Sequence, residues 1–117
     1  MNKKISQTKN VLKRFYAENG NERCGFVLQH YGIHEVPNIC ENPSEGFLVA
    51  TADIRKYIES GVAIATWHTH PNKDANLSGE DYRCFRAYPD VFHYIIGNDS
   101  VRCYKFDKEK QVILEIN

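Results

Sequence analysis

The sequence predicts a mixed α/β domain in which a mixed β-sheet is flanked by helices. Two observations lead to this prediction. Helical and strand-like hydrophobic patterns alternate along the chain. In addition, residues 62–67 form a short apolar run without strict alternation, which is typical of a strand buried inside a sheet. The chain has 117 residues, the usual size of one domain, so we expect residues 1–117 to form a single domain.

Three segments have helical patterns. The first has Ser6 as its expected N-cap and stops at the Asn19-Gly20-Asn21 turn sequence. Its apolar stripe consists of Val11, Leu12, Phe15 and Tyr16. The second helix is expected to open at Thr51, and the third to begin at Ser78 and end before Pro89.

The other apolar runs predict strands, separated by segments rich in turn residues. The expected strands are Cys24–Leu28, a second after the turn near Tyr31 and Gly32, a brief one at 47–49, then 62–67, Phe92–Ile96, 101–106 and Val112–Ile116. Residues 37–46 carry two prolines and two asparagines, and we expect them to form a loop. The predicted order places the end of a central strand immediately before His68.

Charge and cysteine content narrow the classes of partner and compartment. Lys plus Arg and Asp plus Glu number 15 each, so no overall field favours nucleic acid or a membrane surface. No apolar run could cross a bilayer, and the basic N-terminus lacks the apolar stretch of a signal peptide. The four cysteines form no C-x-x-C pair, so we expect reduced thiols rather than two disulfides. We therefore expect a cytoplasmic location, or a host cytoplasm or virion tail for a phage-encoded chain.

Two histidines at the end of the central strand indicate a metal site. Side chains alternate along a strand, so His68 and His70 point to one face while Thr69 points to the other. Asp81, in the first turn of the next helix, can supply a third ligand. Three protein ligands leave the fourth position of zinc for water, as in catalytic rather than structural sites. The sequence thus predicts one catalytic Zn²⁺ per chain.

A purely structural alternative exists for part of this pattern. Ser78 and Asp81 have the spacing of a capping box at a helix start, which needs no metal. Capping does not explain the two histidines. A general base is also needed, and Glu22 is the best candidate because it lies just before a strand. Glu35, Glu41, Glu45 and Glu80 compete with it on sequence alone.

Three segments together carry a family resemblance: 21–28 with Glu22 before a glycine-containing strand, 67–71 with His-x-His-Pro, and 78–81 with Ser-x-x-Asp. They resemble the JAMM (MPN-type) zinc metallopeptidase family. The resemblance implies a fold similar to that of cytidine deaminases. It also implies that Glu22 is the general base and proton shuttle, that His68, His70 and Asp81 bind zinc, and that Ser78 contacts the tetrahedral intermediate or the water. The expected reaction is hydrolysis of a peptide or isopeptide bond by metal-activated water.

Within this family the chain resembles two branches, small prokaryotic JAMM proteins and the JAMM domain of siphophage tail-tip assembly proteins. The second resemblance lies in residues 37–43, Phe47 and 54–57, and that phage domain is commonly fused to an NlpC-type cysteine peptidase. Such a peptidase would here be a separate partner. Expected substrates are a ubiquitin-like or sulfur-carrier protein, a phage structural protein or a peptidoglycan peptide. A non-catalytic MPN-type binding module of a phage tail or other complex is the alternative. A zinc deaminase is disfavoured because the chain lacks H-x-E and P-C-x-x-C.

Overall fold

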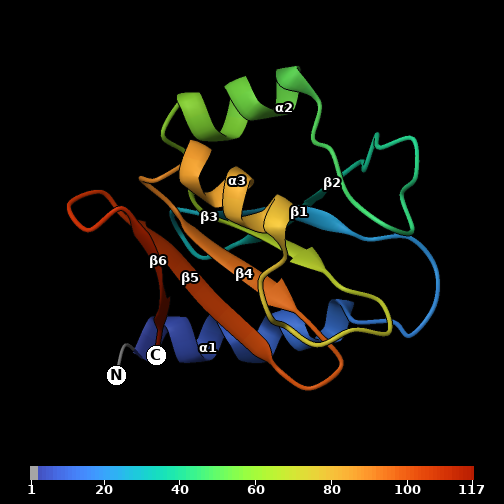
Figure 1. Ribbon diagram of the computed structural model, residues 1–117. Coiled ribbons are helices and arrows are strands. Elements are labelled where there is room, and N and C mark those ends of the chain that lie inside the picture. The colour runs from blue at the N-terminus through green and yellow to red at the C-terminus, as the bar shows by residue number, and fades with distance from the viewer. Residues whose placement is uncertain (1–2) are drawn as a thin grey trace.

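The protein is described by a computed structural model that covers residues 3–117. Within them lies one six-stranded sheet with the order β2-β1-β3-β4-β5-β6 (Figure 1). The strands are β1 (Cys24–Leu28), β2 (Ile33–Val36), β3 (Ala63–Thr69), β4 (Phe92–Ile96), β5 (Val101–Asp107) and β6 (Val112–Ile116). The helices are α1 (Lys3–Leu12), α2 (Thr51–Ile54) and α3 (Gly79–Ala87). The expected mixed α/β class is confirmed.

Among the strands of residues 3–117, only the central pair is parallel. β3 pairs in parallel with β4, whereas the four other neighbouring pairs are antiparallel. A parallel pair needs a crossover connection, and α3 lies within the segment that connects β3 to β4. The carboxyl end of β3, where the chain leaves for this crossover, is the place where open α/β sheets bind ligands.

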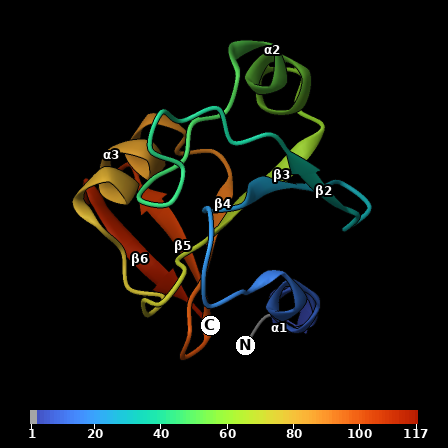
Figure 2. The same cartoon turned by 90° about the vertical axis from the view of Figure 1, so that its right-hand side faces the viewer.

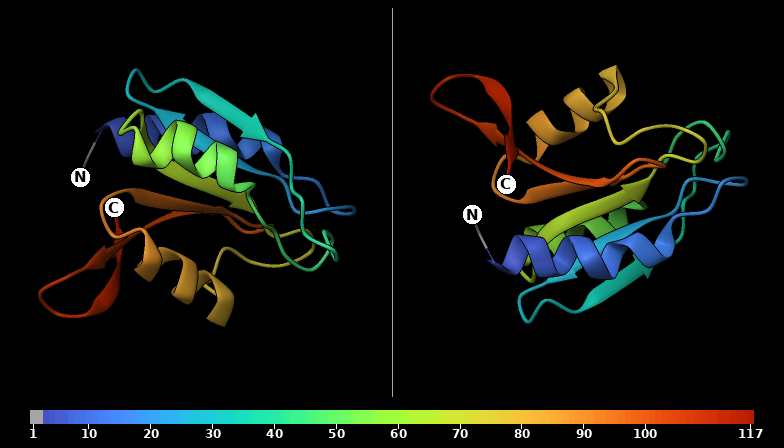
Figure 3. Two further views of the ribbon diagram at one scale, coloured as in Figure 1. Left: turned by 90° about the horizontal axis from the view of Figure 1, so that it is seen from above. Right: turned by 90° about the horizontal axis from the view of Figure 1, so that it is seen from below.

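Helices cover both faces of the sheet. α1 lies on one face, and α2 and α3 lie on the opposite face (Figure 1 and Figure 2). Seen from above, α2 lies along the half of the sheet that contains β3, and α3 lies along the half that contains β5 and β6 (Figure 3). A 3₁₀ turn, Lys13–Phe15, extends α1, and a π-type turn, Arg55–Glu59, extends α2.

The core follows the alternation of the strands. On the α1 face, Leu12 packs with Val27, Trp67 and Ile96, all fully or nearly fully buried. Trp67 lies so close to β1 that a Cβ at Gly25 would come within 2.8 Å of its ring. On the other face one cluster gathers around Phe26 and Tyr57 under α2, and a second around Phe85 and Ile95 under α3. The candidate site lies on this second face.

Two local predictions were wrong. Ser6 lies inside α1 and does not cap it. Residues 47–49 are not a strand, because backbone pairing of this segment is limited to the bond from Ile39 N to Leu48 O. One isolated backbone bond does not make a ladder. The strand predicted at 62–67 is β3, which continues through His68 to Thr69.

Among residues 3–117, no helix is long and apolar enough to cross a membrane.

Candidate metal centre

The end of β3 brings His68 and His70 together. Between them, the Thr69 backbone N–H donates to Arg23 O, just before β1. The His70 N–H donates at 2.8 Å to the carbonyl of Ile96, the last residue of β4. The chain therefore stays extended through His70, and alternation holds. The two imidazole Nε2 atoms lie 3.1 Å apart, and both rings are buried.

The start of α3 supplies Asp81 and Ser78. Ser78 is the N-cap: its Oγ accepts a hydrogen bond from Asp81 N, and Asp81 Oδ2 accepts one from Ser78 N at 3.0 Å. The capping box expected from sequence is thus present. It does not occupy the carboxylate fully, because Asp81 Oδ1 lies 3.0 Å from His68 Nε2 and Oδ2 lies 3.1 Å from His70 Nε2.

Glu22 reaches the same place from the other neighbouring strand. β1 and β3 pair with Cys24 opposite His68. The same register continues at the next pair, where Thr69 N donates to Arg23 O at 2.9 Å and Arg23 N donates to the Thr69 hydroxyl at 2.8 Å. Glu22 therefore falls opposite His70. The Glu22 side chain is on the face that carries the histidines, and only 8% of the residue is exposed.

These groups have the geometry of metal ligands. A tetrahedral zinc with bonds of 2.0–2.1 Å separates its ligand atoms by about 3.3 Å. The three separations among His68 Nε2, His70 Nε2 and the Asp81 carboxylate are 3.0–3.1 Å. Glu22 also belongs here, since ligand atoms of Glu22, His68 and His70 all lie within 4.8 Å of one another. The structure therefore offers two overlapping donor sets, one completed by Asp81 and one by Glu22.

The ring protons of His68 and His70 give a second reason to expect a cation at this cluster. His70 Nδ1 lies 2.9 Å from the Asp74 carbonyl, which can only accept, so Nδ1 carries a proton. A neutral His70 then directs its Nε2 lone pair at Asp81 Oδ2. A proton on His68 Nε2 satisfies the contact between His68 and Asp81 Oδ1, but the contact between His70 Nε2 and Asp81 Oδ2 still lacks a proton. Facing lone pairs about 3 Å apart need either a further proton on His70 or a metal ion between them.

The pKa values reflect the same crowding. Burial raises the pKa of the Glu22 carboxyl, and the Asp81 charge adds to this against the opposing effect of the histidines. Burial also acts on Asp81, but hydrogen bonds from His68 and His70 outweigh it and hold the pKa of Asp81 below its usual range. Burial opposes the charged form of His70, yet its bonds to Asp81 and Asp74 raise the His70 pKa overall.

The loop after His70 is held rigidly. Gly97 lies against this loop so closely that a Cβ there would come within 2.4 Å of the Asp74 carbonyl carbon. Asp99 Oδ1 accepts a hydrogen bond from Ala75 N at 2.9 Å. Both contacts fix the peptide that presents its carbonyl to His70 Nδ1. This carbonyl keeps the Nε2 lone pair of a neutral His70 pointed at the site.

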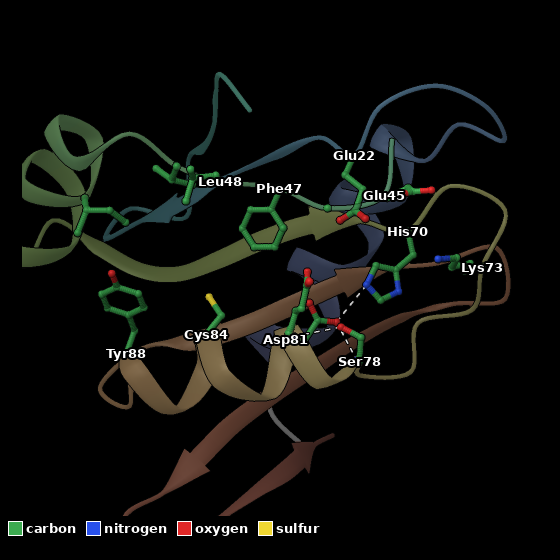
Figure 4. Close-up of a pocket in the computed structure, with 14 residues that line it drawn as sticks. Glu22, Glu45, Phe47, Leu48, His70, Lys73, Ser78, Asp81, Cys84 and Tyr88 are labelled. Atoms are coloured by element: carbon green, nitrogen blue, oxygen red, sulfur yellow. Dashed lines mark hydrogen bonds and ion pairs between the residues drawn. The ribbon is translucent and has the colours of Figure 1, made fainter. Parts of the chain in front are cut away.

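A cleft of about 310 Å³ opens over the cluster. Figure 4 shows Glu22, His70, Ser78 and Asp81 at one end of it. The other end runs between the 46–49 segment and α3 and is mainly apolar, with Leu48 and Tyr88 facing it. The mouth carries charged side chains: Glu45, Lys73 and Glu80. A polar, metal-competent end thus continues into an apolar channel.

The competing carboxylates take other places. Glu35 forms a two-pronged ion pair with Arg23, with distances of 2.8 and 2.6 Å. Glu41 is exposed, and Glu45 and Glu80 are exposed at the cleft mouth. Glu22 is therefore the carboxylate, among these five, that lies with the histidines. All four cysteines are free thiols in the structure.

Two residues near the cluster were missed by sequence reasoning. Asn38 donates from its amide to Glu22 O at 2.8 Å and to Gly46 O at 3.0 Å, joining the two segments. Phe47 stacks its ring on His68, with 4.4 Å between ring centroids. The loop composition of 37–46 signals neither contact, because each depends on how distant segments meet.

Comparisons with known proteins agree with this architecture. The profile of prokaryotic homologs of the JAB domain matches residues 8–107. No curated protein matches. The solution structure of protein DSY2949 from Desulfitobacterium hafniense is similar over 100% of this chain and 88% of that one, with a TM-score of 0.63 and 18% identity. That of a Salinibacter ruber protein is similar over 96% and 84%, with a TM-score of 0.53 and 15% identity.

At these identities the two solution structures support the fold alone, whereas the profile covers most of the chain, including Glu22, both histidines, Ser78 and Asp81. This places the protein in the JAMM/MPN superfamily. The chain belongs to the family of prokaryotic homologs of the JAB domain.

Proposed function

We propose that this protein is a zinc-dependent metallopeptidase that hydrolyses a peptide or isopeptide bond. One observation carries the proposal: His68, His70 and Asp81 converge at 3.0–3.1 Å with the buried carboxylate of Glu22 beside them. Two imidazoles and one carboxylate are a donor set found in catalytic zinc sites. In the proposed arrangement these three hold one zinc ion per chain.

Zinc held by His68, His70 and Asp81 would lower the pKa of a water molecule bound to it to about 7. Glu22 lies beside these ligands and can take up and return a proton there. Its raised pKa suits this role, because a base that must also act as an acid works best with a pKa closer to neutral. The capped N-terminus of α3 holds Asp81 in place without help from substrate.

Ser78 has a proton to offer to substrate. Its Oγ accepts from Asp81 N, so its own hydroxyl hydrogen remains available, and Ser78 lines the cleft. A hydrogen bond from this hydroxyl to the developing oxyanion would contribute about 3 kcal/mol to the transition state. The helix-capping role and this role use different atoms of the hydroxyl and are compatible.

The cleft favours a peptide-like substrate. Its apolar channel between Leu48 and Tyr88 suits an extended apolar segment, while the scissile bond lies at the polar end. We propose substrates among ubiquitin-like or sulfur-carrier proteins, phage structural proteins and peptidoglycan peptides. A phage tail-tip role, with a separate NlpC-type peptidase as partner, is the narrower form of this proposal. It rests on the resemblance of residues 37–43, Phe47 and residues 54–57.

Glu22→Gln tests the function. Zinc content and hydrolysis of a panel of peptide and isopeptide substrates are measured for the wild type, Glu22→Gln and Glu18→Gln. Glu18 is an exposed carboxylate in the same loop before β1, so it controls for loss of charge. We expect Glu22→Gln to keep its zinc and to lose between about 10²- and 10⁴-fold in rate. Full activity of Glu22→Gln would refute the base assignment. A zinc-loaded wild type that cleaves nothing would instead favour the non-catalytic binding module.

A further inference from the structure

His68 lacks the contact that normally orients a metal-binding histidine. Such a histidine usually donates its second ring N–H to a carboxylate, a carbonyl or water, which fixes the plane of the ring. His70 follows this rule through the Asp74 carbonyl. His68 is fully buried, and its Nδ1 has no hydrogen-bond partner within residues 3–117. Something other than a hydrogen bond must set the orientation of the His68 ring.

Aromatic rings enclose His68 instead. The Phe47 ring stacks on the imidazole with a centroid separation of 4.4 Å and an angle of 26° between planes. Phe85 approaches from another direction, edge-on, at 6.2 Å. A flat ring stacked on the imidazole restricts rotation about its last side-chain bond, because any rotation brings the two rings into collision or out of contact.

Phe47 can serve this purpose because its own backbone is fixed. The Asn38 amide donates to Gly46 O and accepts from Leu48 N, both at 3.0 Å, which are the groups on either side of Phe47. The half-buried Phe47 ring also packs against the cluster around Phe26. A segment outside the sheet thereby holds one aromatic ring in a defined place over the end of β3.

We propose that Phe47 is a positioning residue that orients the His68 imidazole for metal binding, in place of a hydrogen bond to Nδ1. This inference rests on the metal-binding part of the proposed function. Phe47 acts through His68 and supplies no atom to the metal. Because Phe47 also lines the cleft, the same ring forms part of the substrate channel and supports a metal ligand.

Metal titration of Phe47→Leu tests the inference. Leucine fills part of the space but has no flat face to stack on His68. We expect the dissociation constant for zinc to rise about 10-fold, the loss typical of residues that orient metal ligands. The visible absorption of the cobalt(II)-substituted protein should also change, because it reports ligand geometry. Phe47→Tyr, which restores the ring, should return both readouts to wild-type values.

Phe92→Leu is the matched control. Phe92 is also a half-buried phenylalanine packed on the core, but at the start of β4 and away from the cluster. We expect it to lower stability without changing zinc affinity or the cobalt spectrum. If Phe92→Leu weakened zinc binding as much as Phe47→Leu, loss of packing in general would explain the effect and the inference would fail.

Other outcomes also decide the matter. Wild-type affinity and spectrum in a folded Phe47→Leu would overturn the inference, as would failure of Phe47→Tyr to restore them. Should Phe47→Leu not fold, Phe47→Met replaces it with a more adaptable side chain; loss of affinity supports the inference and wild-type affinity overturns it. A wild type that binds no zinc would refute the proposed function itself, a result separate from all of these.

Discussion

His93 and the pair His68 and His70 are buried on the same face of the sheet, but they differ in whether protein groups supply hydrogen-bond partners for their ring nitrogens. His93, on β4, has a protein partner for each ring nitrogen: Nε2 donates to Tyr88 O at 2.9 Å and Nδ1 accepts from the Thr66 hydroxyl at 2.7 Å. Its ring stacks on Phe85 at 4.2 Å. A carbonyl on one side and a hydroxyl on the other fix a single neutral tautomer.

The ring nitrogens of His68 and His70 are not accounted for in this way. Their Nε2 atoms face each other and the Asp81 carboxylate, and His68 Nδ1 has no partner among the described residues. Burial of a histidine is therefore no sign of function in itself. The difference lies in whether neighbouring protein groups account for its protons. Where they do, the histidine stabilises the fold, and where they do not, the site is suited to a cation.

Asp81→Asn should produce the largest effect on this difference. Asparagine has nearly the same shape as aspartate but no charge. We expect zinc affinity to fall by at least about 100-fold, which is the upper end of the loss seen when a residue that only orients a metal ligand is replaced. Zinc titration against a chelator measures this. Asp90→Asn is the control, because Asp90 forms only an exposed ion pair with Lys108. If Asp81→Asn bound zinc normally, the alternative donor set of Glu22, His68 and His70 would be the correct one.

His93 should show its structural role in the dependence of stability on pH. Burial lowers the pKa of His93 from its ordinary 6.5 to about 4. The unfolded chain therefore binds a proton at higher pH than the folded protein does. The stabilisation is fully present above about pH 6.5, decreases as the pH falls and is gone near pH 4, a change of about 3 kcal/mol.

Chemical unfolding at several pH values, compared between wild type and His93→Gln, measures this contribution. Glutamine can still donate and accept but does not titrate in this range. The wild type should lose more stability than His93→Gln between pH 6.5 and 4. If the stability of the two proteins depended on pH in the same way, the pKa of His93 would not be lowered in the fold. His93 would then not differ from His68 and His70 in the way proposed.

Substitution of Ser78 should have the smallest effect on stability. Ser78 contributes to the fold as a helix cap and also lies at the proposed metal site. Ser78→Ala removes the cap on Asp81 N, which should lower the free energy of unfolding by about 1 kcal/mol. Ser78→Thr keeps a hydroxyl and should restore most of it. If Ser78 also binds the oxyanion, Ser78→Ala should reduce hydrolysis by more than this loss of stability explains. If Ser78→Ala hydrolyses substrate at the wild-type rate under conditions where it is fully folded, Ser78 has the capping role alone.

The parts of the fold that were predictable depend on periodic patterns. The strand Cys24–Leu28 and the helix that begins after Ser78 were expected from apolar periodicity and capping, and both are present. The shared face of His68 and His70 followed from alternation along β3. Glu22 was singled out among five glutamates mainly by family resemblance, and the register of β1 with β3 shows why it reaches the histidines.

The missing parts depend on contacts between distant segments. Residues 47–49 have the composition of a strand, but the Asn38 amide takes the place of a neighbouring strand at Leu48 N. The stacking of Phe47 on His68 joins residues from a loop and a strand that no periodic pattern relates. Ser6 looked like a cap because polar residues suit helix ends, yet α1 already includes Lys3.

The most direct test of this account is the zinc content of the purified protein. Wild type, His70→Gln and His93→Gln are loaded with zinc, dialysed and measured by elemental analysis, with folding checked by circular dichroism. We expect one zinc ion per chain in the wild type and in His93→Gln, and none in His70→Gln. A folded wild type without zinc, or folded His70→Gln that retains it, would contradict the account.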